Sequence, residues 1–259
     1  MDSIFELFLY FRLGKADPER SQVLYYSADT GASKVLDVGK LPHQEEGTKR
    51  IVVVSDTHDR YRGLNLPAGD VFIHAGDIFM TGRIFSDSRG NERIADFNQW
   101  LEGLDFKSKI VIGGNHDKPI ERAGLEAVQQ LLSNAIYLEN QNVVVDSLNV
   151  FGCPLSRGHS GNCAFQSEDF VLKTKNDVIN TSKNGKLDIL ITHGPNFNLA
   201  KALQPQLHVF GHAHALHGVH EPGRKLDAHI CGCLTVNGSI MNTKYNPHNL
   251  PVVVDIRFT

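Results

Sequence analysis

Short apolar runs separated by polar stretches dominate the chain from residue 50 onward. They fall at nine places: residues 51–54, 71–74, 109–112, 142–145, 148–151, 187–192, 207–210, 234–236 and 252–256. Apolar runs of about four to eight residues bounded by turn-forming residues are typical of strands that are buried on both faces. The pattern therefore predicts a core built from many short strands.

Helical periodicity occupies several of the intervals between these runs. Apolar residues recur three and four positions apart over residues 92–104, 121–132 and 168–180, which is the spacing of one face of a helix. Strand–helix alternation early in the chain gives way to strand–strand succession later. This order predicts an α/β fold, namely a two-sheet mixed β-sandwich flanked by helices.

The first 49 residues have a different pattern. Apolar runs at residues 23–26 and 34–38 flank a turn-forming stretch at residues 28–31, and this arrangement predicts a β-hairpin. The segment is too short to enclose a core of its own. We therefore predict an N-terminal extension over residues 1–49, followed by one domain over residues 50–259.

Composition and charge narrow the class of protein. The 259 residues are 41% hydrophobic and 21% charged, with a formal net charge of −3, which is ordinary for a folded globular domain. Because neither sign of charge forms a long block, we expect no binding of nucleic acid by bulk charge. The 13 histidines are the one departure from average composition, and at that density they indicate metal chemistry.

No early segment has the length or charge pattern of a targeting sequence. The apolar stretch at residues 4–11 fits one helical face, is interrupted by Glu6, and is far shorter than the ~20 residues of a membrane-spanning helix. We expect it to pack on the domain. The cysteines are Cys153, Cys163, Cys231 and Cys233. They form no C-x-x-C pair, so we predict free thiols. Together with the short early apolar stretch, this predicts a cytoplasmic location and no membrane span. The oligomeric state stays open.

Asp, His or Asn residues directly follow five of the predicted strands, usually beside a glycine. They are Asp56 and His58, Asp77, Asn115 with His116 and Asp117, His193, and His212 with His214. Ligands of open α/β sheets bind at the carboxyl ends of the strands. We therefore expect these five strand ends to converge on one site. His74 and His208 lie inside strand runs, so we expect them to be buried supports rather than ligands.

The residue types at these strand ends suit two adjacent divalent cations. In extended chain, residues i and i+2 project to the same side, so Asp56 and His58 can address one location. Asp77 has two carboxylate oxygens and can bridge. Imidazole and oxygen ligands without thiolate favour Mn, Fe, Zn or Co. Two cations with two carboxylates and one bridging hydroxide leave a charge of about +1, which suits an anionic phosphate ester.

The ordered motifs D-x-H, G-D, G-N-H-D, H-G and G-H-x-H, over residues 56–214, resemble the calcineurin-like metallophosphoesterase superfamily. The resemblance implies the two-sheet sandwich with flanking helices, and phosphoester hydrolysis by a metal-bridging hydroxide without a covalent enzyme intermediate. It implies one metal held by Asp56, His58, Asp77 and His214, and a second held by Asp77, Asn115, His193 and His212. It also implies that the catalytic residue His116 contacts the phosphate and protonates the leaving oxygen.

A narrower resemblance lies near the C-terminus. Asn237-Gly238-Ser239, residues 245–251 and residues 252–255 are similar to the tail of the metallophosphoesterase-domain-containing group, which resembles class III cyclic nucleotide phosphodiesterases. The resemblance implies a phosphodiesterase acting on a small phosphoester or nucleotide, with cyclic nucleotides among its substrates. It also implies two divalent metal ions, Mn²⁺ in activity assays, with Fe or Zn as alternatives.

One departure from the superfamily bears on the type of substrate. Ser/Thr protein phosphatases carry an Asp three residues after the bridging Asp, and Met80 stands at that position here. The departure weakens the protein phosphatase hypothesis and leaves the partner of His116 unassigned. A phosphoprotein or small-molecule phosphomonoesterase, a DNA-repair nuclease and a non-catalytic scaffold of the same fold remain as alternatives. Scaffolds commonly lose ligand residues, whereas every ligand position is filled here.

Overall fold

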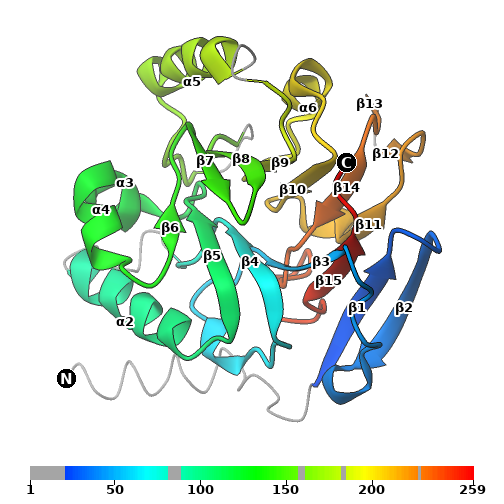
Figure 1. Ribbon diagram of the computed structural model, residues 1–259. Helices are drawn as coiled ribbons and strands as arrows, with labels where there is room; N and C mark the ends of the chain where they lie inside the picture. Colours follow the sequence, from blue (N-terminus) through cyan, green and yellow to red (C-terminus); the bar gives the residue numbers. More distant parts are fainter. Residues whose placement is uncertain (1–20, 81–88, 157–160, 182–184, 227–228) are drawn as a thin grey trace.

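The computed structural model describes residues 21–80, 89–156, 161–181, 185–226 and 229–259. The stretch at residues 4–11, which we expect to pack on the domain, lies outside the described residues. The core of the protein is a sandwich of two β-sheets with helices on both outer faces (Figure 1). The predicted fold class is therefore confirmed.

The first sheet has seven strands in the order β2-β1-β15-β3-β4-β5-β6. Along the chain these are β1 (Gln22–Ser27), β2 (Ala32–Asp37), β3 (Lys49–Val54), β4 (Gly69–Ala75), β5 (Phe106–Ile112), β6 (Ile136–Tyr137) and β15 (Val252–Ile256). Strands β3, β4, β5 and β6 run parallel, and β15 pairs antiparallel with β3. The carboxyl ends of β3, β4 and β5 consequently meet at one edge of the sheet.

The second sheet has six strands in the order β11-β14-β10-β9-β8-β7. They are β7 (Gln141–Val145), β8 (Leu148–Cys153), β9 (Ile189–Thr192), β10 (Leu207–Phe210), β11 (Gly218–His220) and β14 (Leu234–Asn237). A separate ribbon joins β12 (Lys225–Leu226) to β13 (His229–Ile230). All nine predicted apolar runs are strands. The strands missed from the sequence, β6, β11, β12 and β13, are only two or three residues long, too short for an apolar period to show.

Helices cover the outer face of each sheet (Figure 1). They are α2 (Gly90–Glu102), α3 (Lys118–Ala123), α4 (Leu125–Leu131), α5 (Glu168–Thr181) and α6 (Phe197–Leu203), with short 3-10 turns η1 (Val38–Lys40), η2 (Tyr61–Gly63) and η4 (His214–Leu216). The helix predicted over residues 121–132 is two helices instead. Gly124 separates them with a φ of +78°, a backbone conformation that no helix can contain.

Period-two alternation along the central strands builds two cores. Ile51 and Val53 of β3 face the second sheet and belong to the cluster between the sheets. Val52 and Val54 of the same strand belong to the cluster under the helices. Because both faces of the strand are buried, the sequence reads as an unbroken apolar run instead of an alternating one.

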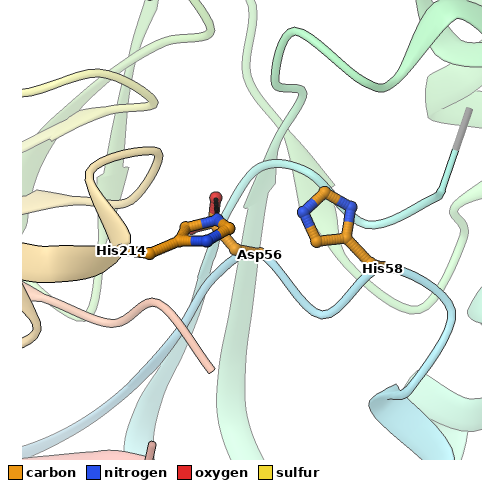
Figure 2. A group of neighbouring side chains, drawn as sticks. All are labelled: Asp56, His58 and His214. Atoms are coloured by element: carbon orange, nitrogen blue, oxygen red, sulfur yellow. Dashed lines mark hydrogen bonds and ion pairs between the residues drawn. The ribbon is translucent and has the colours of Figure 1, made fainter. Parts of the chain in front are cut away.

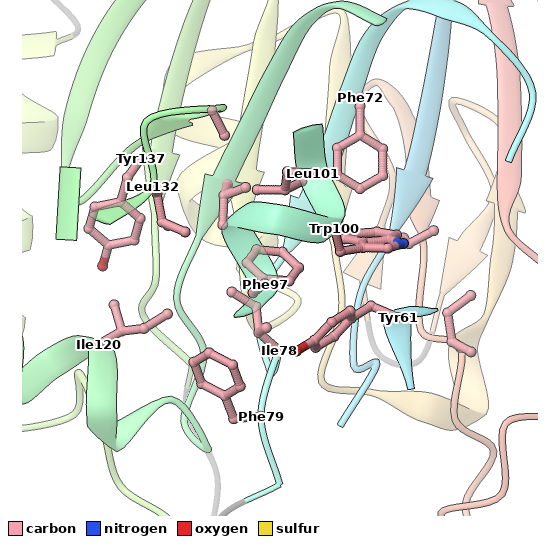
Figure 3. Packing of buried hydrophobic residues seen from close by; sticks show 14 of the residues in the cluster. Tyr61, Phe72, Ile78, Phe79, Phe97, Trp100, Leu101, Ile120, Leu132 and Tyr137 are labelled. Atoms are coloured by element: carbon pink, nitrogen blue, oxygen red, sulfur yellow. The ribbon is translucent and has the colours of Figure 1, made fainter. Parts of the chain in front are cut away.

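The cluster under α2, α3 and α4 is rich in aromatic side chains (Figure 3). Phe97 and Trp100 of α2 stack with their ring centroids 5.4 Å apart, and the ring of Tyr61 lies 5.0 Å from that of Phe97. Ile78 and Phe79 are fully buried in the same cluster. Since they come directly after Asp77, this packing anchors the turn that carries that carboxylate.

The predicted N-terminal hairpin is present and extends the first sheet. Strands β1 and β2 pair antiparallel across the expected turn, and β1 pairs parallel with β15. Arg50 donates to Asp255 at 2.6 Å, and the Tyr25 hydroxyl donates to the same carboxylate at 3.0 Å. These contacts join the hairpin to β15 and β3. The division of the chain into residues 1–49 and 50–259 stays a prediction.

In the described parts of the chain, every helix is too short or too polar to cross a membrane. The four cysteines carry free thiols, of which Cys163 alone is exposed. For Arg157 and His159 we expect a surface loop, with contact to the substrate phosphate as the alternative; both residues lie outside the described residues.

Candidate metal centre

The seven predicted ligand residues all lie in the turns that follow β3, β4, β5, β9 and β10. They are Asp56, His58, Asp77, Asn115, His193, His212 and His214. The first four come from the first sheet and the last three from the second. The carboxylate of Asp56 accepts a hydrogen bond from the backbone N–H of His212 at 2.9 Å, so the turns of the two sheets are in direct contact at this edge.

Asp56, His58 and His214 form one group of ligand atoms (Figure 2). Their ligand atoms all lie within 4.8 Å of one another. The His214 Nε2 atom is 3.1 Å from the Asp56 Oδ1 atom. Two nitrogens and one carboxylate at this spacing can surround a single divalent cation.

Asp77, His193 and His212 form a second group, whose ligand atoms also lie within 4.8 Å of one another. The His193 Nε2 atom is 3.2 Å from Asp77 Oδ1. The amide oxygen of Asn115 lies 3.0 Å from His193 Nε2 and 2.8 Å from His212 Nδ1. Asn115 therefore belongs to this second group, as the motif order implies.

Asp77 connects the two groups. Its Oδ1 atom faces His193 of the second group at 3.2 Å, and its Oδ2 atom faces His58 of the first group at 3.9 Å. A carboxylate that presents one oxygen to each group has the geometry of a bridging ligand.

Backbone carbonyls orient three of the four histidines. The Nδ1 atoms of His58, His193 and His214 lie 3.3, 2.8 and 3.0 Å from the carbonyl oxygens of Phe79, Ala75 and Asn242, respectively. In a neutral imidazole, donating Nδ1–H to a carbonyl leaves the Nε2 lone pair directed into the centre, where a metal can bind it.

The donor atoms fit divalent cations. His58 Nε2 is buried without a hydrogen-bond partner among the described residues, and such an atom costs free energy unless something binds it. A cation in the first group would satisfy this nitrogen. Because the donors are imidazole nitrogens and carboxylate or amide oxygens, the centre suits first-row divalent metals rather than a thiolate-bound structural zinc.

Two motif glycines leave room for the carboxylates. A Cβ atom on Gly114 would overlap Asp77 Oδ1, and a Cβ atom on Gly211 would overlap Ser55 Oγ and Asp56 Oδ2. Any larger residue would displace a predicted ligand. This is the physical reason for glycine at these two positions.

Four of the seven predicted ligand residues have left-handed backbone conformations. The φ angles are +51° at Asp56, +43° at His58, +53° at Asp77 and +61° at His212. Positive φ is uncommon outside glycine, and such strain clusters at functional sites because the surrounding structure must enforce it. Here each strained residue turns its side chain toward the shared centre.

Two buried histidines support the ligand turns from inside the strands, as expected. His74 Nε2 is 3.0 Å from Thr57 Oγ1, and His208 Nε2 is 2.8 Å from Thr192 Oγ1. Each threonine adjoins a ligand residue and donates its hydroxyl to a backbone carbonyl. Burial lowers the pKa of both histidines to about 3, so both are neutral and donate Nε2–H.

Two further side chains hold the carboxylate turns together. Both belong to motifs that the sequence shows, but the sequence alone assigned neither of them an individual role. Ser239 donates its hydroxyl to Asp56 Oδ2 at 2.8 Å. Asp117 accepts hydrogen bonds from the backbone N–H groups of Ile78, Phe79 and Gly114. Asp117 thereby ties the turn after β4 to the turn after β5. Burial, with the charge of Asp77, raises the pKa of Asp117 to about 7.

The two central carboxylates make the centre attractive to positive charge. Burial favours their neutral form, but the hydrogen bond from His214 and the charge of His193 outweigh it and hold the pKa of Asp56 below its usual range. Burial also opposes a charge on His193, yet Asp77 and Asp56 raise the pKa of that imidazole to about 9.

His116 is not part of the first group, but its imidazole forms a third group of possible ligand atoms with His58 and Asp77. Its ring centroid is 4.7 Å from that of His58. Burial lowers the pKa of His116 to about 4, so the imidazole is neutral near pH 7. The Asn162 amide nitrogen lies 3.2 Å from His116 Nε2. Sequence reasoning missed this contact, because residue 162 follows no strand and belongs to no motif. At Met80, the backbone N–H donates to Asp59, and the backbone carbonyl accepts from Arg93.

Comparison with known proteins identifies the relatives of this chain. The family model for calcineurin-like phosphoesterases matches residues 49–216. Metallophosphoesterase domain-containing protein 1 of Homo sapiens is 30% identical over 264 residues, which cover 85% of this chain and 75% of that protein. A UPF0046 protein of Caenorhabditis elegans is 27% identical over 219 residues, covering 71% and 70% of the two chains.

A solved structure with 16% sequence identity superposes with a TM-score of 0.51, covering 73% of this chain and 90% of its own. This likeness supports the two-sheet fold. The family match and the human relative bear out both resemblances read from the motifs, the broader one and the narrower one. The chain is thus a member of the calcineurin-like phosphoesterase family.

Proposed function

We propose that this protein hydrolyses phosphoesters, and diesters in preference to monoesters, at a centre of two divalent cations. The observation that carries the proposal is the position of Asp77, whose two oxygens face two separate groups of ligand atoms. Family membership supports the reaction class. The proposed substrate is a small phosphodiester, with cyclic nucleotides as candidates, and we expect the protein to act in the cytoplasm.

Each cation would have four protein ligands. One would be held by Asp56, His58, Asp77 and His214, and the other by Asp77, Asn115, His193 and His212. Mn²⁺ is the metal we expect to support activity, with Fe or Zn as alternatives. When bound, the pair would neutralise charge on the phosphate oxygens and activate a water molecule for attack.

The chain's own contribution is to hold these side chains in place before the substrate binds. Backbone carbonyls orient His58, His193 and His214. Ser239 and the backbone N–H of His212 fix the carboxylate of Asp56. Because these contacts are buried or partly buried, little reorganisation is needed when the substrate arrives, and such preorganisation lowers the barrier.

His116 is the residue we assign to the leaving group. Its pKa of about 4 means that it is neutral in the free protein near pH 7. A phosphate anion beside the ring would favour the protonated form. His116 could then hydrogen-bond to the phosphate and pass its proton to the departing oxygen, while Asn162 restrains the Nε2 edge of the ring.

Charge supports the preference for diesters. The two cations, balanced by Asp56, Asp77 and a hydroxide, leave a net charge of about +1. This charge matches the single negative charge of a phosphodiester better than the double charge of a monoester. The side chain at position 80 is also uncharged, unlike the Asp at that position in protein phosphatases.

The test combines metal analysis with a panel of substrates. Metal content is measured on the purified protein, and kcat/KM is then compared for bis-nitrophenyl phosphate, nitrophenyl phosphate and 2′,3′- and 3′,5′-cyclic nucleotides under one metal condition. We expect two metals per chain and faster diester hydrolysis. A preference of tenfold or more for the monoester, about 1.4 kcal/mol, would make the protein a phosphomonoesterase. Bound metal without turnover of any ester would make it a scaffold.

A further inference from the structure

Tyr245 lies beside the candidate metal centre although it belongs to none of the ligand motifs. Its ring centroid is 5.0 Å from that of His214, 5.3 Å from that of His58 and 6.2 Å from that of His116. The ring therefore lies against both histidines of the first ligand group and against the residue assigned to the leaving group.

Hydrogen bonds order the loop that carries Tyr245 and connect it to the candidate centre. The backbone N–H of Tyr245 donates to the carbonyl of Asn242, which also receives the Nδ1 contact of His214. The Asn242 side chain accepts from the backbone N–H groups of Lys244 and Asn246. Each of these contacts is 3.1 Å or shorter. The same carbonyl thus positions both a predicted ligand and the tyrosine.

Tyr245 is unusual in both its backbone and its exposure. Its φ angle is +58°, a conformation that bulky residues adopt only when the surrounding structure enforces it. Its surface is 47% exposed, so core packing does not explain why a large aromatic ring occupies this position. The structure holds an aromatic ring at the edge of a polar centre, on a residue about half of whose surface is open to solvent.

We infer that Tyr245 is a specificity-determining residue that stacks against a planar aromatic group on the substrate. The inference rests on the proposed phosphoester hydrolysis and names the class of ester, one carrying an aromatic ring such as a nucleobase. Stacking on an aromatic side chain accepts any flat ring. An aliphatic ester group of similar size lacks the flat π-face and gains less from the contact.

The binding test uses phosphonates, which keep the charged phosphoryl group and cannot be hydrolysed. Calorimetry on the Mn²⁺-loaded protein compares benzylphosphonate, cyclohexylmethylphosphonate and methylphosphonate. The first two have similar size, and only the first is flat. We expect benzylphosphonate to bind about tenfold more tightly than cyclohexylmethylphosphonate, a difference of about 1.4 kcal/mol.

Variants separate the ring from other effects. Tyr245→Leu should weaken benzylphosphonate binding by about tenfold and change methylphosphonate binding by less than about twofold. Tyr245→Phe should keep the benzyl preference, because it keeps the ring. Leu172→Ala removes another exposed apolar side chain, 60% exposed on α5, and should change neither affinity. Metal content and melting temperature establish that each variant is folded.

Three results would overturn the inference. One is equal binding of the benzyl and cyclohexylmethyl compounds by the wild type. Another is loss of the benzyl preference in Tyr245→Phe, which would assign the effect to the hydroxyl. The third is equal weakening of benzyl- and methylphosphonate in Tyr245→Leu, which would show a disturbed metal centre. A benzyl preference in a protein that hydrolyses no ester would instead keep the role of Tyr245 and reject the proposed function.

Discussion

Asp77 is the residue on which both halves of the centre depend. Asp77→Asn replaces one carboxylate oxygen by an NH₂ group, which cannot bind a cation. One oxygen then remains, so either one ligand group loses its contact with residue 77 or the two groups share that oxygen. We expect turnover to fall by at least about a hundredfold and bound metal to fall from two per chain. Steady-state kinetics and metal analysis measure the two effects.

A matched change away from the centre serves as the control for Asp77. Asp96→Asn alters a half-exposed carboxylate on α2 that pairs with Arg62. The substitution should leave metal content and turnover unchanged. Full activity of Asp77→Asn with two bound metals would show that Asp77 does not bridge.

His116 is predicted to act on the leaving group and not on the metals. His116→Ala should keep both metals and lose activity by about 10²–10⁴ on ribose esters, whose leaving alkoxide needs a proton. The loss on a nitrophenyl ester should be smaller, because nitrophenolate leaves without help. The ratio of kcat/KM for the two esters is the measurement.

The control for His116 is His43→Ala, which removes an exposed histidine from the segment before β3. Because the predicted ligands follow that strand, His43 lies in a different segment of the chain from the candidate centre. Equal losses on the two esters in His116→Ala would contradict a role in protonation. Loss of metal in that variant would make His116 a ligand, which its place in a group with His58 and Asp77 allows.

At the scale of elements, Asp70 joins the amino ends of β3 and β4. Its carboxylate accepts from Lys107, from Gln44 and from the backbone N–H of Arg50. Burial alone would raise the pKa of Asp70, but these donors outweigh it, so the pKa in the folded protein lies below its usual value. A carboxylate with a lowered folded pKa stabilises the fold above its unfolded pKa of about 3.9 and loses that contribution as pH falls through the folded value.

Asp70→Asn should therefore reduce the free energy of unfolding by about 1–3 kcal/mol at pH 7. The difference from wild type should shrink as the pH falls below about 3.9. Urea unfolding at pH 7 and at several acidic values measures it. Asp37→Asn, in an exposed pair with Lys40, should have little effect at any pH. A difference that grows toward low pH would contradict the assignment.

Elements with a strong local signal could be predicted from the sequence, and contacts between distant segments could not. The nine apolar runs, and the polar residues that follow them and meet at the candidate centre, are local patterns, so each could be named by number from the sequence. Asn162, Ser239 and Tyr245 reach the centre from loops with no periodicity, and only the folded chain brings them to His116, Asp56 and His58. The break at Gly124 depended on a backbone angle that an apolar period does not report.

At the scale of the whole molecule, the candidate centre lies where turns from both sheets meet. The ligands of the first group come from β3 and β10, and those of the second come from β4, β9 and β10, with Asn115 from β5. Cations bound there would link the two sheets. They would bind only the folded protein, because an unfolded chain does not bring these residues together. Metal binding should therefore stabilise the entire sandwich and not only the turns.

The expected result is a melting temperature that rises with the concentration of metal. A cation at a hundred times its dissociation constant adds about 2.7 kcal/mol, which corresponds to roughly 5–10 °C for a chain of this size. Calorimetric scans of chelator-treated protein with increasing Mn²⁺ measure the shift. Asp96→Asn should show the full shift and Asp77→Asn much less. If Mn²⁺ left the melting temperature of the wild type unchanged up to millimolar concentration, the seven side chains would not form a metal centre.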